Sequence, residues 1–208
     1  MGHRERLRAP LVVLAGGDVV TQRYATIVAD PPWIYAEPHV SFPGAPGRQR
    51  RVTKPLPYAQ MPVEAIKHLP VGDLAEPNAH LWLWTTNRYL RDAFDVAAAW
   101  GFAFRQVVVW RKTGSPSPFA ASVAPNHAEF LLFCARGSLP LLTRLASNVV
   151  DAPKQYAHSR KPEVFVDLIE SVSPGPRVEL FSRRHRLGWD VHGFESANTA
   201  QLTEETAS

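Results

Sequence analysis

Residues 24–33 read YATIVADPPW, and this stretch decides which class of fold the sequence can form. The run Tyr24–Ala29 is apolar and rich in β-branched and aromatic side chains, which is typical of a buried strand. It ends directly in Asp30, two prolines and Trp33. Proline fixes φ and lacks a backbone donor, so the two prolines predict a rigid corner after the strand. In open α/β sheets, ligands bind at this carboxyl end of the strands.

Further apolar runs on both sides of this stretch also predict buried strands. They are LVVL from Leu11, HLWLWT from His80, FAFRQVVVW from Phe102, AEFLLFCA from Ala128, RVELF from Arg177 and GWDVHGFE from Gly188. Helical patterns lie between them, from Pro62 to about His68, over RYLRDAFDVAAAW before Gly101, and over PEVFVDLIESV from Pro162. Because strands alternate with helices, the sequence predicts an α/β fold with a mainly parallel sheet covered by helices on both faces.

The length and composition fit one globular domain. The chain has 208 residues, of which 45% are hydrophobic and 20% charged, and such a length suits a single domain of about 150–250 residues. We expect this domain over residues 1–196, with 36–57 as an active-site or substrate loop and 197–208 as a polar, flexible tail. No stretch approaches the roughly 20 apolar residues of a membrane helix, so we expect a soluble, cytoplasmic protein without membrane contact.

The distribution of basic residues and the single cysteine indicate which kinds of binding site the sequence can form. Lys and Arg (23) exceed Asp and Glu (19), and arginines gather at Arg48, Arg50 and Arg51 and again at Arg183, Arg184 and Arg186. Such clusters can hold phosphates, although a solvated surface explains them equally well. Cys134 lies in an apolar run and is expected to be a buried core residue. No Cys/His spacing predicts a metal site.

The corner at Asp30 has the chemistry needed to hold an adenine amine. The nitrogen lone pair of that amine is delocalised into the ring, so the amine is a poor nucleophile. The Asp30 carboxylate and the Pro31 carbonyl could accept its two hydrogens and favour a tetrahedral nitrogen whose lone pair faces a methyl donor. We expect Trp33 to stack on the base, which must be unpaired or flipped out of a duplex to enter. A simple turn that ends the strand is the alternative interpretation.

The motifs and their order resemble the N6-adenine methyltransferases, the family that includes the catalytic subunit of the eukaryotic messenger-RNA adenosine methyltransferase and many bacterial and phage proteins. The resemblance runs from about Tyr24 to Glu195, and ADPPW is its most specific piece. The supporting pieces are PYAQM from Pro57, LWLWTTNRYL from Leu81, WGFAFRQVVVWRKTG from Trp100, NHAEFLLFCARG from Asn126, HSRKPEVF from His158 and VELFSRRHRLGWDVHGFE from Val178. It implies a Rossmann-like, S-adenosylmethionine-dependent fold in permuted order, in which the catalytic motif precedes the cofactor-binding segment.

The resemblance also implies roles for individual residues. The catalytic corner would be Asp30, Pro31, Pro32 and Trp33. The residues that bind S-adenosylmethionine would be Asp30, Pro31, Lys161, Glu179, Leu180, Phe181, Arg183, His185, Phe194 and Glu195. The substrate-binding residues would be Tyr58, Trp84, Lys112 and Glu129, to which the basic cluster described above adds Arg48, Arg50 and Arg51. Phe194 replaces an asparagine that is frequent in relatives, so contacts to the cofactor's adenine are expected from the backbone or from stacking.

These observations favour an active enzyme that methylates the N6 amine of adenine in nucleic acid, with DNA favoured over RNA because a short, single-domain member resembles bacterial and phage forms. The alternative is a catalytically inactive, nucleic-acid-binding subunit of a heterodimer, although inactive relatives have typically lost the DPPW residues. A nicotinamide-dependent oxidoreductase would share the α/β pattern but lacks the glycine-rich turn. The sequence does not determine the oligomeric state, so a homodimer and a heterodimer are both left open.

Overall fold

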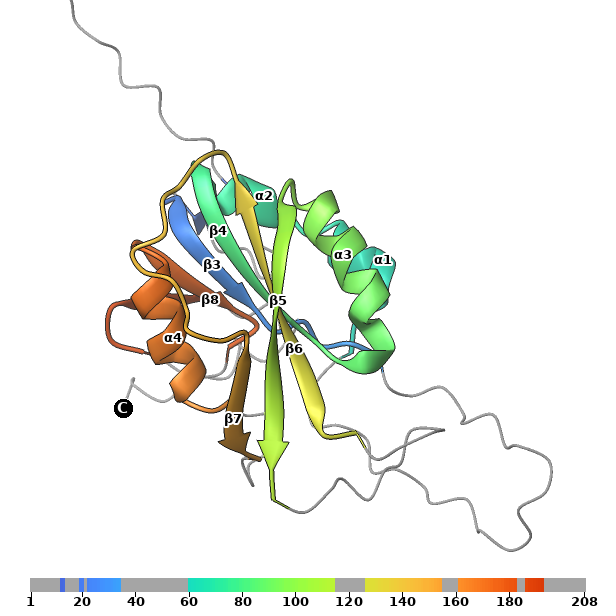
Figure 1. The fold of residues 1–208 in the computed structure, drawn as a ribbon. Coiled ribbons are helices and arrows are strands. Elements are labelled where there is room, and N and C mark those ends of the chain that lie inside the picture. The colour runs from blue at the N-terminus through green and yellow to red at the C-terminus, as the bar shows by residue number, and fades with distance from the viewer. Residues whose placement is uncertain are drawn as a thin grey trace, which may run out of the picture.

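The computed structural model describes residues 12–13, 19–20, 22–34, 60–114, 126–154, 161–182 and 186–192. Within this part of the chain, a seven-stranded sheet has the strand order β7-β5-β6-β4-β3-β8-β9 (Figure 1). Its strands are β3 (Tyr24–Ala29), β4 (Ala75–Thr85), β5 (Ala103–Thr113), β6 (Ala128–Arg136), β7 (Val149–Pro153), β8 (Arg177–Leu180) and β9 (Trp189–His192). The helices are α1 (Val63–Lys67), α2 (Val71–Leu74), the short 3-10 helix η1 (Asn87–Tyr89), α3 (Leu90–Ala99) and α4 (Val164–Val172).

The sheet is mainly parallel. Within the described sheet, β6 runs antiparallel to both of its neighbours, β4 and β5. The pairs β3–β4, β3–β8, β5–β7 and β8–β9 are all parallel. The carboxyl ends of β3, β4, β5 and β8 therefore lie at the same edge of the sheet, where β6 begins. This arrangement confirms the predicted α/β class.

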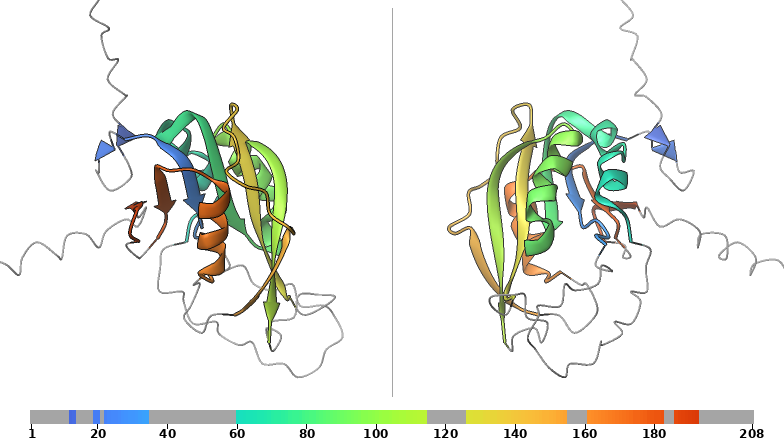
Figure 2. Two further views of the ribbon diagram at one scale, coloured as in Figure 1. Left: turned by 60° about the vertical axis from the view of Figure 1, so that its left-hand side comes forward. Right: turned by 90° about the vertical axis from the view of Figure 1, so that its right-hand side faces the viewer.

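Helices cover both faces of the sheet, as predicted. Helices α1, α2 and α3 lie on one face and α4 lies on the other (Figures 1 and 2). The two cores follow the alternation of side chains along the strands. On β4, Leu81 and Leu83 belong to the core under α1–α3, whereas Trp82 and Trp84 belong to the core under α4.

The apolar stripe of α4 explains why this helix packs on the tryptophans of the sheet. Phe165, Ile169 and Val172 recur at helical spacing and are all buried. The Phe165 ring makes edge contacts with Trp84 at 4.9 Å and with Trp110 at 6.0 Å between ring centres. These contacts hold the start of α4 against the carboxyl ends of the central strands, and so place the nearby residue Lys161 there.

Several of the described elements differ from those expected from the sequence. The run LVVL contributes only β1 (Val12–Val13), which pairs with β2 (Val19–Val20) in a separate two-stranded sheet rather than in the central one. The strand β7 was not predicted, because VVDAP is short and contains a charge and a proline at the edge of the sheet. Helix α2 was also missed, because four residues carry no measurable periodicity.

Cys134 is fully buried, and burial raises the pKa of its thiol to about 12. This confirms the prediction of a core cysteine. In the part of the chain that the structure describes, we find no helix of the length and apolarity needed to cross a membrane.

Gly137 makes a testable contribution to stability. It follows β6 with a φ of 61°, and a Cβ at this position would overlap Asn78 Oδ1 and lie 2.6 Å from the carbonyl oxygen of Pro77. Gly137→Ala is expected to lower the free energy of unfolding by about 2 kcal/mol, measured by chemical denaturation. Gly188→Ala is the control, because Gly188 also has positive φ but open space around it. Equal losses in both variants would contradict a cost set by the contact with Asn78.

Candidate active site

Side-chain alternation places four functional side chains on the α4 face, at the carboxyl edge of the sheet. Val28 and Trp84 are buried on this face, and Asp30 comes two residues after Val28. Lys112 comes two residues after the buried Trp110 on β5, and Glu129 comes two residues before the buried Leu131 on β6. The strand order therefore sets the four side chains in a row: Lys112 on β5, Glu129 on β6, Trp84 on β4 and Asp30 after β3.

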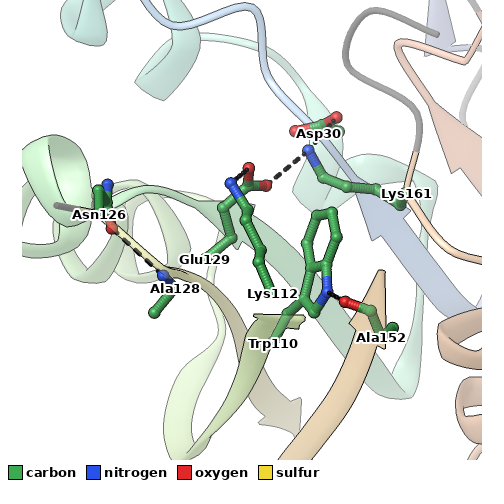
Figure 3. A network of polar contacts seen from close by, with 8 residues as sticks. All are labelled: Asp30, Trp110, Lys112, Asn126, Ala128, Glu129, Ala152 and Lys161. Atoms are coloured by element: carbon green, nitrogen blue, oxygen red, sulfur yellow. Dashed lines mark hydrogen bonds and ion pairs between the residues drawn. The ribbon is translucent and has the colours of Figure 1, made fainter. Parts of the chain in front are cut away.

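Lys161, which lies just before α4, joins the members of this row (Figure 3). Its ammonium lies 2.8 Å from Asp30 Oδ2 and 3.2 Å from Glu129 Oε2. It also lies 5.1 Å from the centre of the Trp84 ring, on the strand between those two carboxylates. Lys112 Nζ lies 2.6 Å from the other carboxylate oxygen of Glu129, Oε1. Positive and negative charges thus alternate along the row.

The burial of these groups makes their charges interdependent. Burial alone would lower the pKa of Lys161, but the carboxylates of Asp30 and Glu129 outweigh it and raise that pKa above its usual range. Burial alone would raise the pKa of Glu129, but the charges of Lys161 and Lys112 outweigh it and hold that pKa below its usual range. The Asp30 side chain is the most exposed of the four ionic groups, at 32%, so an incoming ligand reaches Asp30 first.

The backbone of the Asp-Pro-Pro corner is fixed by hydrogen bonds. The Trp33 amide donates to the Pro31 carbonyl at 2.8 Å, and the Met61 amide donates to the Pro32 carbonyl at 2.9 Å. A parallel bridge also joins Trp33 and Met61. Each proline carbonyl therefore already accepts one hydrogen bond. A carbonyl oxygen has two lone pairs, so the Pro31 oxygen can still accept a second donor.

Trp33 lies inside the protein rather than at its surface. Its ring is stacked on Tyr89, with 5.1 Å between ring centres and 15° between planes, and the residue is only 2% exposed. Its Nε1 donates to the Trp84 carbonyl at 3.3 Å, and the Tyr89 hydroxyl donates to the Ile34 carbonyl. The expected stacking of Trp33 on the target base does not fit this arrangement, because no face of the ring is accessible. Trp33 instead holds the corner against β4.

The carboxyl end of β8 lies beside this corner. Glu179 pairs with Val28 in the register of β8 and β3, and burial raises the pKa of its carboxyl group. Leu180 is fully buried, so only its backbone can meet a ligand. Phe181 has a φ of 65°, a conformation that is rare for a bulky side chain and that concentrates at functional sites. The chain therefore turns sharply at the end of this strand.

The structure brings together Asp30, Lys161, Glu129, Lys112 and Trp84, and places Glu179 on the adjoining strand. The sequence did not predict a role for Tyr89, although this residue follows closely after β4 and so lies near the carboxyl edge of the sheet. Several predicted site residues lie outside the described residues: Arg48, Arg50, Arg51, Tyr58, Arg183, His185, Phe194 and Glu195. Among the described residues, no group of three or more His, Cys, Asp or Glu side chains is placed to hold a metal ion.

Comparison of the sequence with known proteins identifies a family that has this arrangement of motifs. The sequence model of the family described as MT-A70 matches residues 24–195. The type II methyltransferase M.MunI of Mycoplasma sp is 27% identical over 187 residues, which cover 84% of this chain and 78% of that protein. The N(6)-adenosine-methyltransferase MT-A70-like protein of Drosophila melanogaster is 27% identical over 81% of this chain. The N(6)-adenosine-methyltransferase catalytic subunit METTL3 of Homo sapiens is 24% identical over 79% of this chain.

The coverage differs between these relatives. The chain spans most of the bacterial protein but only 26% of the length of the Drosophila and human proteins. The match of the family covers the Asp-Pro-Pro-Trp corner, all seven strands of the described central sheet and the segment with Lys161. It confirms the resemblance seen in the sequence motifs. The chain therefore belongs to the MT-A70 family of S-adenosylmethionine-dependent adenine-N6 methyltransferases.

Proposed function

We propose that this chain transfers a methyl group from S-adenosylmethionine to the N6 amine of adenine in DNA. The observation that carries the proposal is the Asp30 carboxylate, held by Lys161 beside the Pro31 carbonyl at the carboxyl edge of the sheet. Membership of the MT-A70 family supports the reaction. DNA is favoured because the relative that the chain covers over most of its length is a type II methyltransferase, a class that modifies DNA.

Asp30 and Pro31 would act by orienting the amine. The Asp30 carboxylate accepts one N6 hydrogen, and the second lone pair of the Pro31 oxygen accepts the other. Lys161 holds Asp30 Oδ2 and so fixes the rotation of the carboxylate. With both hydrogens held, the nitrogen lone pair points toward the donor, and this positioning would supply most of the rate. The nitrogen then loses one proton, which the Asp30 carboxylate or water can take.

The described residues fit S-adenosylmethionine, whose sulfonium supplies an electrophilic methyl group. Its sulfonium and ammonium groups are positive, and Asp30 and Glu179 offer carboxylates on neighbouring strands. The turn at Phe181 leads the chain away from the end of β8. We assign cofactor binding to the described residues Asp30, Pro31, Lys161, Glu179, Leu180 and Phe181, and to Arg183, His185, Phe194 and Glu195 outside them.

The target base would lie on the other side of Asp30, toward β6. Glu129 and Lys112 belong to this side, and Trp84 lies beneath Lys161. Trp84 is 3% exposed, so it would form the floor of the pocket rather than a stacking surface. We propose that Tyr58 and the arginines Arg48, Arg50 and Arg51 complete the nucleic-acid side, within one methyltransferase domain over residues 1–196.

The choice of DNA is tested with matched DNA and RNA oligonucleotides, offered single-stranded and as duplexes with methyl-tritiated cofactor. The protein is expected to label DNA at least about tenfold faster than RNA of the same sequence. Faster labelling of RNA would reverse the assignment of the substrate. If neither is labelled while the protein still binds the cofactor, the inactive-subunit alternative takes its place.

A further inference from the structure

Glu129 is the one side chain among the described site residues that is held by two lysines through two different oxygens. Lys112 Nζ is 2.6 Å from Oε1, and Lys161 Nζ is 3.2 Å from Oε2. The Lys112 and Glu129 side chains are each only 17% exposed. The Lys112–Glu129 pair therefore lies beside the Lys161–Asp30 pair along the sheet edge and is less exposed than Asp30.

We propose that Lys112 is a positioning residue, which holds Glu129 so that Lys161 stays shared between Glu129 and Asp30. The proposal rests on the proposed function of Asp30 as the group that orients the amine. It assigns Lys112 an ion pair with Glu129 as its role, in place of the direct contact with the nucleic acid that was expected from the sequence.

The backbone of Lys112 is well placed for this task. Its amide donates to the His127 carbonyl at 2.8 Å, and Lys112 pairs with Ala152 in the register of β5 and β7. The residue therefore lies between two neighbouring strands, whereas Lys161 lies outside any helix or strand, just before α4. The Lys112 ammonium also lies 5.0 Å from the centre of the Trp110 ring, a favourable cation–π contact. Lys112 is therefore held in place by the neighbouring strands and by Trp110, at one end of the row.

The balance of charge gives Lys112 its effect on Asp30. Among the described residues, the charged groups that face Glu129 are Lys112 from β5, Lys161 from before α4 and, beyond Lys161, Asp30, while β4 presents the uncharged Trp84. With both lysines present, two cations match two carboxylates. Without Lys112, Glu129 can turn both oxygens toward Lys161, which also pairs with Asp30. Lys161 would then move away from Asp30, whose carboxylate would lose its fixed rotation.

The first test measures the Glu129 carboxyl group directly, with no substrate present. Carbon-13-labelled glutamate is titrated by NMR in the wild type, Lys112→Met and Lys112→Arg. The pKa of Glu129 is expected to rise in Lys112→Met, because a stabilising cation is lost, and to stay near the wild-type value in Lys112→Arg. Arg111→Met is the matched control, because the neighbouring Arg111 pairs with the exposed Asp151 instead. An unchanged Glu129 titration in Lys112→Met would overturn the proposal.

The second test separates positioning from phosphate binding. Lys112→Met is expected to lower kcat on the order of tenfold, to shift the acid limb of the rate profile to higher pH, and to leave the KM for nucleic acid near the wild-type value. Lys112→Arg should restore kcat, and Lys112→Gln gives the same comparison if the Met variant does not fold. A higher, salt-dependent KM with unchanged kcat would identify a phosphate contact and overturn the proposal. A different result would contradict the proposed function alone: the wild type makes no N6-methyladenine, while the titration still shows the ion pair of Lys112 and Glu129.

Discussion

The Asp30→Asn variant is expected to lose at least about 100-fold in kcat and much less in its affinity for S-adenosylmethionine, because the other residues assigned to the cofactor remain. Asparagine preserves the shape of the side chain but replaces one acceptor oxygen with a donor and removes the negative charge. It can neither accept the N6 hydrogen in the same way nor hold the Lys161 ammonium, which lies 2.8 Å from Asp30 Oδ2 in the wild type. Single-turnover kinetics and calorimetric titration with the cofactor measure the two effects separately.

The matched control for this variant is Asp95→Asn. Asp95 lies on the exposed side of α3, on the opposite face of the sheet, so the same chemical change is expected to leave kcat unaltered. A folded Asp30→Asn protein that no longer binds the cofactor would show that Asp30 serves the cofactor rather than the amine. Retained transfer in that variant would remove Asp30 from the reaction.

The second large effect is expected for Lys161→Met. Lys161 is the cation between the Asp30 and Glu129 carboxylates, and its loss removes the ion pairs that link these two like charges. The orientation of Asp30 is then lost, and we expect kcat to fall on the order of 100-fold. The pKa of Glu129, which the lysines hold below its usual range, rises when Lys161 is removed. Activity should therefore be lost at a higher pH than in the wild type as the pH falls.

Rate measurements across pH in Lys161→Met and Lys67→Met test this account. Lys67 is also ion-paired, with Glu64 at 2.9 Å on α1, but lies outside the row. Its variant is expected to keep the wild-type kcat and pH profile. A Lys161→Met enzyme that is slow at every pH, with the acid limb unmoved, would separate Lys161 from the ionisation of Glu129.

The sequence predicted best those features that depend on local pattern. The strand Tyr24–Ala29 has the predicted bounds because all of its side chains are buried and the corner that follows ends it sharply. The sheet with helices on both faces followed from the alternation of strands and helices. Edge elements were missed, since β7 (Val149–Pro153) lies at the edge of the sheet and is mostly exposed.

The arrangement within the site could be predicted only in part. The motifs named Asp30, Glu129 and Lys161 one by one, but their contacts depend on the order β5-β6-β4-β3, which motif spacing does not reveal. The same holds for Lys112, whose pairing with Glu129 joins two strands. The burial of Trp33 was missed because its partner, Tyr89, lies in a distant segment. Sequence patterns therefore identified these side chains but did not predict which of them are in contact.

The central claim, methyl transfer to adenine N6 through Asp30, is tested most directly by the chemical position of the new methyl group. The wild type and Asp30→Asn are incubated with adenine-containing DNA and deuterated-methyl S-adenosylmethionine, and the DNA is digested for nucleoside mass spectrometry against authentic standards. We predict N6-methyladenine from the wild type and almost none from Asp30→Asn. N1-methyladenine or methylcytosine as the product, or undiminished N6-methyladenine from Asp30→Asn, would contradict it.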